Sequence, residues 1–146
     1  MRGVLVAAAE PWPKFRDDPR LRDLILEHGE EVEISPDPDW ARMHRMAMAG
    51  DLYAVVLRDA GKLVGYVVCS MMWSLAVKTK VVAFAEFVYV KPEHRPEGMK
   101  LLLDATQATM REAGAHALVI HHGHMRNGVF PPLGAALSMR VWSKTL

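Results

Sequence analysis

Residues 84–103 of the chain read FAEFVYVKPEHRPEGMKLLL, and this stretch decides how we interpret the rest of the sequence. A β-rich apolar run passes through a proline-containing turn and Arg95 into a helix opened by Gly98. Where a strand leads directly into a helix, the unpaired N–H groups of the first helical turn and the helix dipole attract phosphate. A glycine there would let a ligand approach the backbone closely. The stretch therefore predicts a phosphate-binding turn.

The composition is that of a single domain of 146 residues, 51% of them hydrophobic. With 18 basic and 17 acidic residues, the chain has no net field that would favour nucleic acid or an anionic membrane as a partner. No segment approaches the ~20 apolar residues of a membrane span. Cys69 is the only cysteine, and its apolar neighbours predict a buried thiol in a reducing compartment, the cytoplasm.

Residues 1–16 contain an apolar run that is shorter than the ~7–15 residues of a signal-peptide core, and we interpret them as a leading strand or arm. Further along, helix-start signals and β-branched runs alternate. Their order predicts an α/β (α+β) fold with a mixed, mostly antiparallel sheet flanked by helices. The expected elements are helices after Asp18 and Asp37, strands at 52–57, 63–72 and 81–90, a helix from Gly98 to Gly114, and strands at 117–120 and 137–142.

The order of strand, turn and helix around Arg95 resembles the acetyl-CoA motif of the GNAT N-acetyltransferase superfamily, usually written R/Q-x-x-G-x-G/A. The resemblance covers residues 24–146 and implies the same fold. This chain departs from the motif at Lys100, where the family has Gly or Ala, and at Pro96, where glycine is common. The segments PDPDWARMHRMAMAG, GKLVGYVV and VWSKTL also resemble GNAT-like proteins encoded by phages and prophages.

The resemblance implies that acetyl-CoA is the cofactor. It implies that the strand residues Val88, Tyr89 and Val90 face the pantetheine arm. The turn that would hold the pyrophosphate consists of Arg95, Pro96, Glu97, Gly98, Met99 and Lys100.

Two residues of this turn leave alternatives open. Pro96 has no N–H, so one donor is missing. The ammonium of Lys100 would compensate for it, or the side chain would narrow the site. The alternative interpretation of the whole motif is a simple strand-to-helix turn in which Arg95 is solvated.

Glu86 stands where some family members have a carboxylate that acts as general base, often through water. If the strand alternates regularly, Glu86 shares a face with Val88 and Val90. An isolated carboxylate is costly to bury, so this glutamate must be paired, hydrated or functional. The alternative is a glutamate at the rim of the sheet that bonds to a neighbouring strand.

The family's usual general acid is a tyrosine, but the corresponding residue here is Phe130, which cannot donate a proton. Tyr53, Tyr66 and Tyr89 are other phenols, although the sequence places none of them near the sulfur. Water could protonate the departing thiolate instead. Since a general acid contributes about 10²–10⁴-fold, its absence would slow the reaction without abolishing it.

Histidines cluster at His121, His122 and His124, with His116 just upstream. On a strand, only His122 and His124 would share a face, which is too few ligands for a zinc site, and we expect no metal. His122 is instead a candidate auxiliary base or substrate contact beside the acyl group. A polar loop without a catalytic role is the further alternative.

Three functions are compatible with these features. The first is an acetyl-CoA-dependent N-acyltransferase that acts on an amine, either a small molecule or a protein, by direct transfer. The second is a module of the same fold that binds CoA but has lost transfer, and the third is a structural or regulatory protein, such as a phage component. Edge strands of an open sheet would also allow a homodimer.

Overall fold

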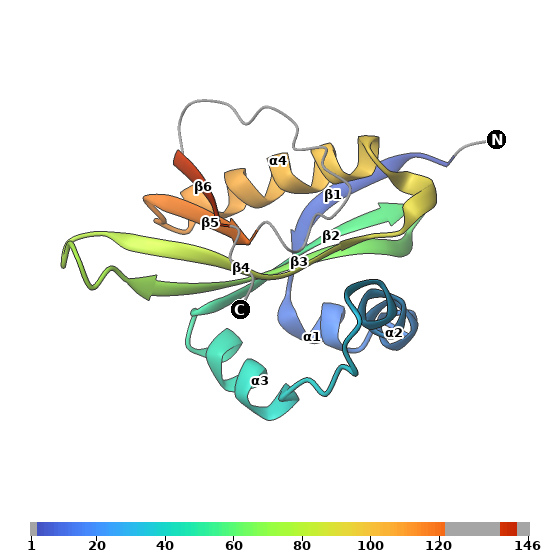
Figure 1. The fold of residues 1–146 in the computed structure, drawn as a ribbon, viewed down its shortest axis with the longest axis horizontal. Coiled ribbons are helices and arrows are strands. Elements are labelled where there is room, and N and C mark those ends of the chain that lie inside the picture. The colour runs from blue at the N-terminus through green and yellow to red at the C-terminus, as the bar shows by residue number, and fades with distance from the viewer. Residues whose placement is uncertain (1–2, 122–137, 143–146) are drawn as a thin grey trace.

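A computed structural model describes residues 3–121 and 138–142 of the chain (Figure 1). The described helices are α1 (Trp12–Arg16), α2 (Leu21–Val32), α3 (Trp40–Met48) and α4 (Glu97–Glu112), with a short 3-10 helix, η1 (Pro92–His94). The described strands are β1 (Leu5–Glu10), β2 (Leu52–Asp59), β3 (Lys62–Trp73), β4 (Val81–Val90), β5 (Ala117–His121) and β6 (Ser138–Trp142).

The six described strands form one sheet in the order β1-β2-β3-β4-β5-β6. Neighbours from β1 to β4 are antiparallel, whereas β4, β5 and β6 run parallel. Figure 1 shows α4 on one face of the sheet and α1, α2 and α3 on the other. The predicted mixed, mostly antiparallel sheet between helices is therefore confirmed.

The hairpin between β2 and β3 forms because Ala60 and Gly61 both adopt positive φ angles, of 48° and 83°. Two such residues give a tight turn that matches the twist of the flanking strands, and glycine adopts this conformation without strain. The hairpin predicted from residues 58–62 is therefore confirmed.

The first part of the chain differs from the prediction in two places. Residues 1–16 were expected to form a leading strand or arm. The strand is β1, but it ends at Glu10 and the chain then turns into α1. Pro13 lies in the first turn of α1, a position where its missing N–H does no harm. The cap of α3 is Asp39 rather than Asp37, because the Asp39 carboxylate accepts the N–H of Arg42 at 2.9 Å.

The sheet separates two apolar cores. The core under α4 is built from alternate strand residues such as Val55, Val67 and Val88, together with Leu102 and Leu103 of the helix. The core on the opposite face packs the helices α1 and α2 against the other residues of the same strands. Its buried members are Trp12, Phe15, Leu21, Leu24, Leu52, Ala54, Val56, Leu63, Tyr66, Val68 and Tyr89.

Strand β4 contains an irregularity that shapes the site. Its register with β3 shifts between Val68 and Cys69, because Glu86 is an extra residue on β4. Parallel pairing with β5 ends at Ala85. Strand β4 continues through residues 86–90. Along these residues, the edge opposite β3 has no strand partner within the described ranges.

Within the described residues, no helix combines the length and the apolar character that a membrane span requires.

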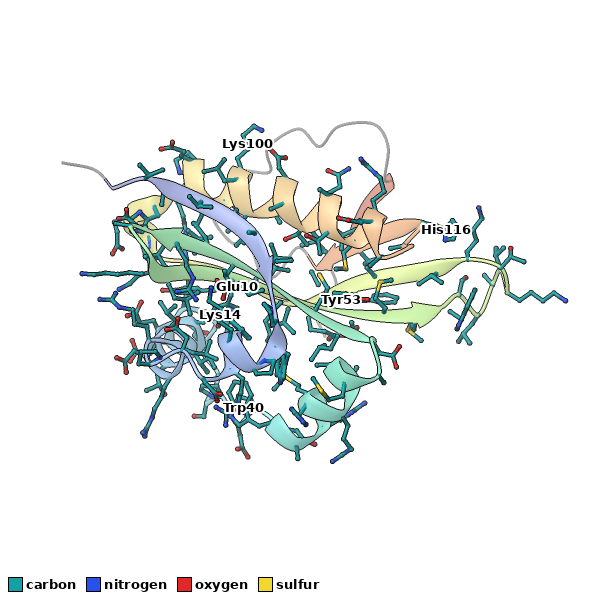
Figure 2. The ribbon with its side chains drawn as sticks, turned by 180° about the vertical axis from the view of Figure 1, so that it is seen from behind. Glu10, Lys14, Trp40, Tyr53, Lys100 and His116 are labelled. Carbon is teal, nitrogen blue, oxygen red and sulfur yellow. The ribbon has the colours of Figure 1, made fainter. Side chains whose placement is uncertain are left out.

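An ion-pair cluster joins β1, β2 and the segment before α2. Arg58 donates to both carboxylate oxygens of Glu10, at 2.7 and 2.9 Å, and also contacts Asp18 at 2.9 Å. The Glu10 side chain is 8% exposed. The hydrogen bond from Arg58 lowers the pKa of Glu10 from its ordinary value of about 4.5, against the opposing effect of burial. Lys14 of α1, four residues after Glu10, also contacts it at 3.2 Å, and the lysine side chain is largely exposed (Figure 2).

We expect Glu10→Gln to lower the free energy of unfolding at pH 7 by about 2 kcal/mol, because charge-assisted hydrogen bonds to Arg58 are lost. A lowered pKa means that the stabilisation is present above the ordinary glutamate pKa and disappears as pH falls through the folded-state pKa. Urea unfolding of both proteins from pH 7 to pH 3 checks this. Lys14→Gln, which removes an exposed partner, should cost less than about 0.5 kcal/mol. A Glu10→Gln deficit that stays constant with pH would contradict the account.

Candidate active site

A cavity of about 400 Å³ lies between the sheet and the helices α1, α2 and α3. Its wall includes the loop of residues 34–39 that joins α2 to α3, and its lining is mostly apolar and aromatic. On the sheet, the lining includes Glu86 and Phe87 of β4. The cavity therefore reaches the place where β4 separates from β5.

Glu86 presents an exposed carboxylate at this point. The hydroxyl of Ser70 on β3 donates to its Oε1 atom at 2.5 Å, which fixes the orientation of the carboxylate. The expectation that Glu86 shares a face with Val88 and Val90 is wrong, because those two valines belong to the core under α4. The extra residue in β4 breaks the alternation and places Glu86 on the cavity side.

Arg95 is bound on two sides. Its Nε atom donates to the carbonyl of Val90 at 2.7 Å, and its Nη2 atom donates to Glu31 of α2 at 2.8 Å. The guanidinium carbon also lies 5.5 Å from the ring centre of Tyr89. The alternative of a merely solvated arginine is therefore wrong: Arg95 holds the turn after β4 against β4 itself and α2.

The first turn of α4 is tightly packed on its inner side. A Cβ atom at Gly98 would lie 2.6 Å from Cδ2 of Leu57, so the glycine allows α4 to approach β2. The space expected beside Gly98 for a ligand is occupied by Leu57. Of the turn residues, Gly98 and Met99 are buried, whereas Pro96 and Glu97 are exposed. The first backbone hydrogen bond of the helix runs from the N–H of Lys100 to the carbonyl of Pro96 at 3.1 Å. The N–H groups of residues 97–99, in the first turn, therefore have no partner within the helix.

Lys100 lies on the outer surface of α4. Its ammonium binds Asp104 at 2.6 Å, so the side chain extends along the helix toward its C-terminus. Figure 2 shows Lys100 on the side of α4 that is turned away from the sheet. The lysine at this motif position therefore does not cover the first turn of the helix.

A buried polar network joins α2 to the middle of the sheet. His28 Nδ1 and the Tyr66 hydroxyl lie 3.0 Å apart, and the His28 ring stacks on Tyr89 with centroids 5.1 Å apart. The Tyr89 hydroxyl donates to Glu27 at 3.0 Å. Burial raises the pKa of Tyr66, and burial together with Glu27 raises the pKa of Tyr89. Both phenols therefore stay protonated at neutral pH.

The sequence contains one signal for this network, the antiparallel pairing of the strands that carry Tyr66 and Tyr89. Tyr66 and Tyr89 are cross-strand partners and thus lie on the same face of the sheet. His28 and Glu27 could not be found from the sequence, because their contacts depend on how α2 packs on the sheet.

His116, just upstream of the histidine cluster, has a structural role, because its ring accepts the N–H of Val81 at 3.1 Å. Within the described residues, no group of three His, Cys, Asp or Glu side chains could hold a metal ion. His122, His124 and Phe130 lie outside the described residues, so their predicted roles stay predictions.

Comparison with known proteins agrees with this geometry. The family model for the acetyltransferase (GNAT) family matches residues 12–127. No curated protein matches the sequence. Among solved structures, the ribosomal-protein-alanine N-acetyltransferase of Brucella melitensis biovar Abortus 2308 has a TM-score of 0.60 at 20% identity, over 80% of this chain and 79% of that one.

Two further structures share the fold. An aminoglycoside acetyltransferase from an uncultured soil metagenomic sample, in complex with trehalose, has a TM-score of 0.63 at 15% identity. The match covers 93% of this chain and 97% of the aminoglycoside acetyltransferase chain. A predicted acetyltransferase from Clostridium acetobutylicum, solved with acetyl-CoA, has a TM-score of 0.63 at 12% identity over 80% of each chain.

The strand that separates from its neighbour, the turn and the helix thus define an acetyltransferase fold. The chain belongs to the acetyltransferase (GNAT) family, and acetyl-CoA is the acetyl donor that this family uses.

We expect Arg95→Gln and Glu31→Gln to weaken acetyl-CoA binding to a similar degree, about three- to tenfold, because each removes one side of the contact that holds the turn. Isothermal titration calorimetry measures both affinities. Glu30→Gln, at an exposed position on the same helix, is the matched control and should bind as the native protein does. If Arg95→Gln abolished binding while Glu31→Gln had no effect, the guanidinium would contact the cofactor directly.

Proposed function

We propose that this protein transfers the acetyl group of acetyl-CoA directly to a primary amine in the cavity, with Glu86 as general base. One observation carries the proposal. Glu86 lies both in the lining of the cavity and at the first residue of β4 beyond its pairing with β5. A base at this junction can reach an amine on one side and a thioester on the other.

The residues around the junction suit the cofactor. Backbone groups of Val88, Tyr89 and Val90 on the separated edge of β4 can bond to the amides of the pantetheine arm. The Val90 carbonyl already accepts a hydrogen bond from Arg95, and its second lone pair remains for another donor. The first-turn N–H groups of residues 97–99 and the dipole of α4 suit the pyrophosphate, while Pro96 contributes no donor.

When bound, acetyl-CoA supplies an activated carbonyl carbon attached to sulfur. Glu86 removes a proton from the amine, directly or through water, so that the nitrogen can form a bond to that carbon. As the carbon–sulfur bond breaks, water protonates the departing thiolate. The products are the acetylated amine and free CoA, and Ser70 holds the base in position throughout.

Direct transfer is favoured over a covalent acyl-enzyme because the chain lacks an activated thiol. Cys69 is the only cysteine, it is fully buried, and burial raises its pKa to about 12. At neutral pH the group is therefore a protonated thiol inside the core and a poor nucleophile.

The names of the neighbouring structures indicate acceptors as different as aminoglycosides and a ribosomal protein's alanine. Either kind of amine would satisfy the proposed chemistry. The proposed reaction therefore does not by itself identify the acceptor amine.

We expect Glu86→Gln to lower kcat by about 100-fold or more, since a positioned general base contributes about 10²–10⁴-fold. Acetyl-CoA affinity should stay within about twofold of the native value, because the amide keeps the shape of the side chain. A thiol-release assay and calorimetry measure the two quantities. Glu112→Gln, on the exposed end of α4, is the control. Native turnover in Glu86→Gln would exclude Glu86 as the base, and binding without turnover in the native protein would favour a CoA-binding module.

We also expect the protein to keep full activity after treatment with iodoacetamide at pH 8, because a buried thiol with a raised pKa is not available for alkylation. Mass spectrometry of the intact chain should show no added carbamidomethyl group, and unfolding in urea before treatment should allow the modification. Rapid modification of the folded protein with loss of activity would show a reactive Cys69.

A further inference from the structure

We infer that the acceptor is a primary amine attached to an apolar carbon skeleton, an inference that rests on the transfer reaction proposed above. The cavity beside Glu86 would hold that skeleton, while the carboxylate receives the amine. This assigns a substrate class to the cavity from the chemistry of its walls.

The walls that the three helices contribute to the cavity are mostly apolar. Trp12 and Phe15 come from α1, Met43 and Met46 come from α3, and Ile25 comes from α2. The unbranched methionine side chains can adapt to skeletons of different shape. Such walls stabilise a ligand mainly by removing its apolar surface from water. Few polar groups stand among them, one being the buried indole N–H of Trp12, which has no hydrogen-bond partner among the described residues.

Aromatic contacts hold one wall in place. The rings of Trp12 and Trp40 lie 6.4 Å apart, and the Arg16 guanidinium lies 4.2 Å from the Trp40 ring centre. Trp12 also packs on Phe15 at 5.5 Å. A wall that is already ordered by these contacts loses little side-chain freedom when a ligand binds.

The charges around the cavity suit one ammonium group. The ionic side chains of the lining are the carboxylates Asp37, Asp39 and Glu86 and the guanidinium of Arg42. Asp39 is already used in capping α3, and Asp37 is exposed to solvent on the loop between α2 and α3, away from the apolar walls. The uncharged polar pair His28 and Tyr66 also lines the cavity, but these two groups bond to one another. A ligand with several charges would therefore leave most of them against apolar walls, which is costly.

The size of the cavity agrees with a small amine. Cavities that bind small ligands are about 300–1,000 Å³ in volume, and this one is about 400 Å³. One aryl or alkyl group of modest length would fill it.

Three isosteric amines test the inference on the native protein. Hexylamine, 5-aminopentan-1-ol and 1,5-diaminopentane carry the same amine on chains of equal length that end in a methyl, a hydroxyl and an ammonium group. We expect kcat/KM for hexylamine to exceed that for the alcohol by about tenfold or more, with the diamine lower still. Calorimetry of the same amines without acetyl-CoA gives their affinities independently of turnover.

A pair of variants locates the effect in the cavity. Met43→Gln places an amide of similar shape in the wall, and we expect it to reduce the preference for hexylamine over the alcohol by about threefold or more. Met48→Gln is the matched control, because Met48 lies on the same helix, is 59% exposed and is not part of the lining. This control should keep the native preference.

The outcomes separate this inference from the proposed reaction. Equal or better use of the alcohol or the diamine would overturn the apolar acceptor and leave the acetyltransferase intact. Much faster acetylation of a leucine-headed peptide than of hexylamine would overturn it in favour of a polypeptide acceptor. If no amine is acetylated, preferential binding of hexylamine would support the apolar cavity while the proposed reaction fails, and equal binding of all three amines would refute the inference.

Discussion

The extra residue in β4 is the constraint on which the site depends. If β4 alternated regularly, Glu86 would face the core under α4 together with Val88 and Val90, where an unpaired carboxylate is costly. The shift in register at this residue turns Glu86 to the opposite face, where Ser70 binds it and the cavity receives it. Because pairing with β5 ends at the preceding residue, the same place also frees one edge of β4. One irregularity therefore sets both the position of the proposed base and the opening for the proposed donor.

Helix α2 connects the two halves of this site. Its residues Glu27 and Glu31 bind Tyr89 and Arg95 at the end of β4, and Glu27 also contacts Lys91 at 3.5 Å. The other side of the same helical turns contributes to the cavity wall. Since charge-assisted hydrogen bonds are stronger than neutral ones, α2 fixes the turn before α4 relative to the cavity. The turn proposed to bind the cofactor and the cavity proposed to bind the acceptor thus share one structural support, and a displacement of α2 would disturb both.

The sequence predicted most of the fold because the relevant signals are local. The bounds of β4 match the predicted strand, the β2–β3 hairpin follows from its turn residues, and the order of elements indicates the mixed sheet. The sequence did not reveal the short α1, whose residues lack a full helical period. The site was predicted less well, since Glu86 was identified but its face was not. A register shift depends on the pairing of two strands and leaves no mark in the alternation of a single strand.

The turn of residues 95–100 shows why a motif alone cannot assign roles to its members. Gly98 is constrained by packing, since a Cβ atom there would meet the Leu57 side chain, and either that side chain or α4 would have to shift. Position 100 has no such constraint, because Lys100 points outward and binds Asp104. The departure from Gly or Ala at that position therefore changes the surface of α4 without disturbing its first turn. A family pattern records packing and binding requirements together, and only the surroundings of each residue separate the two.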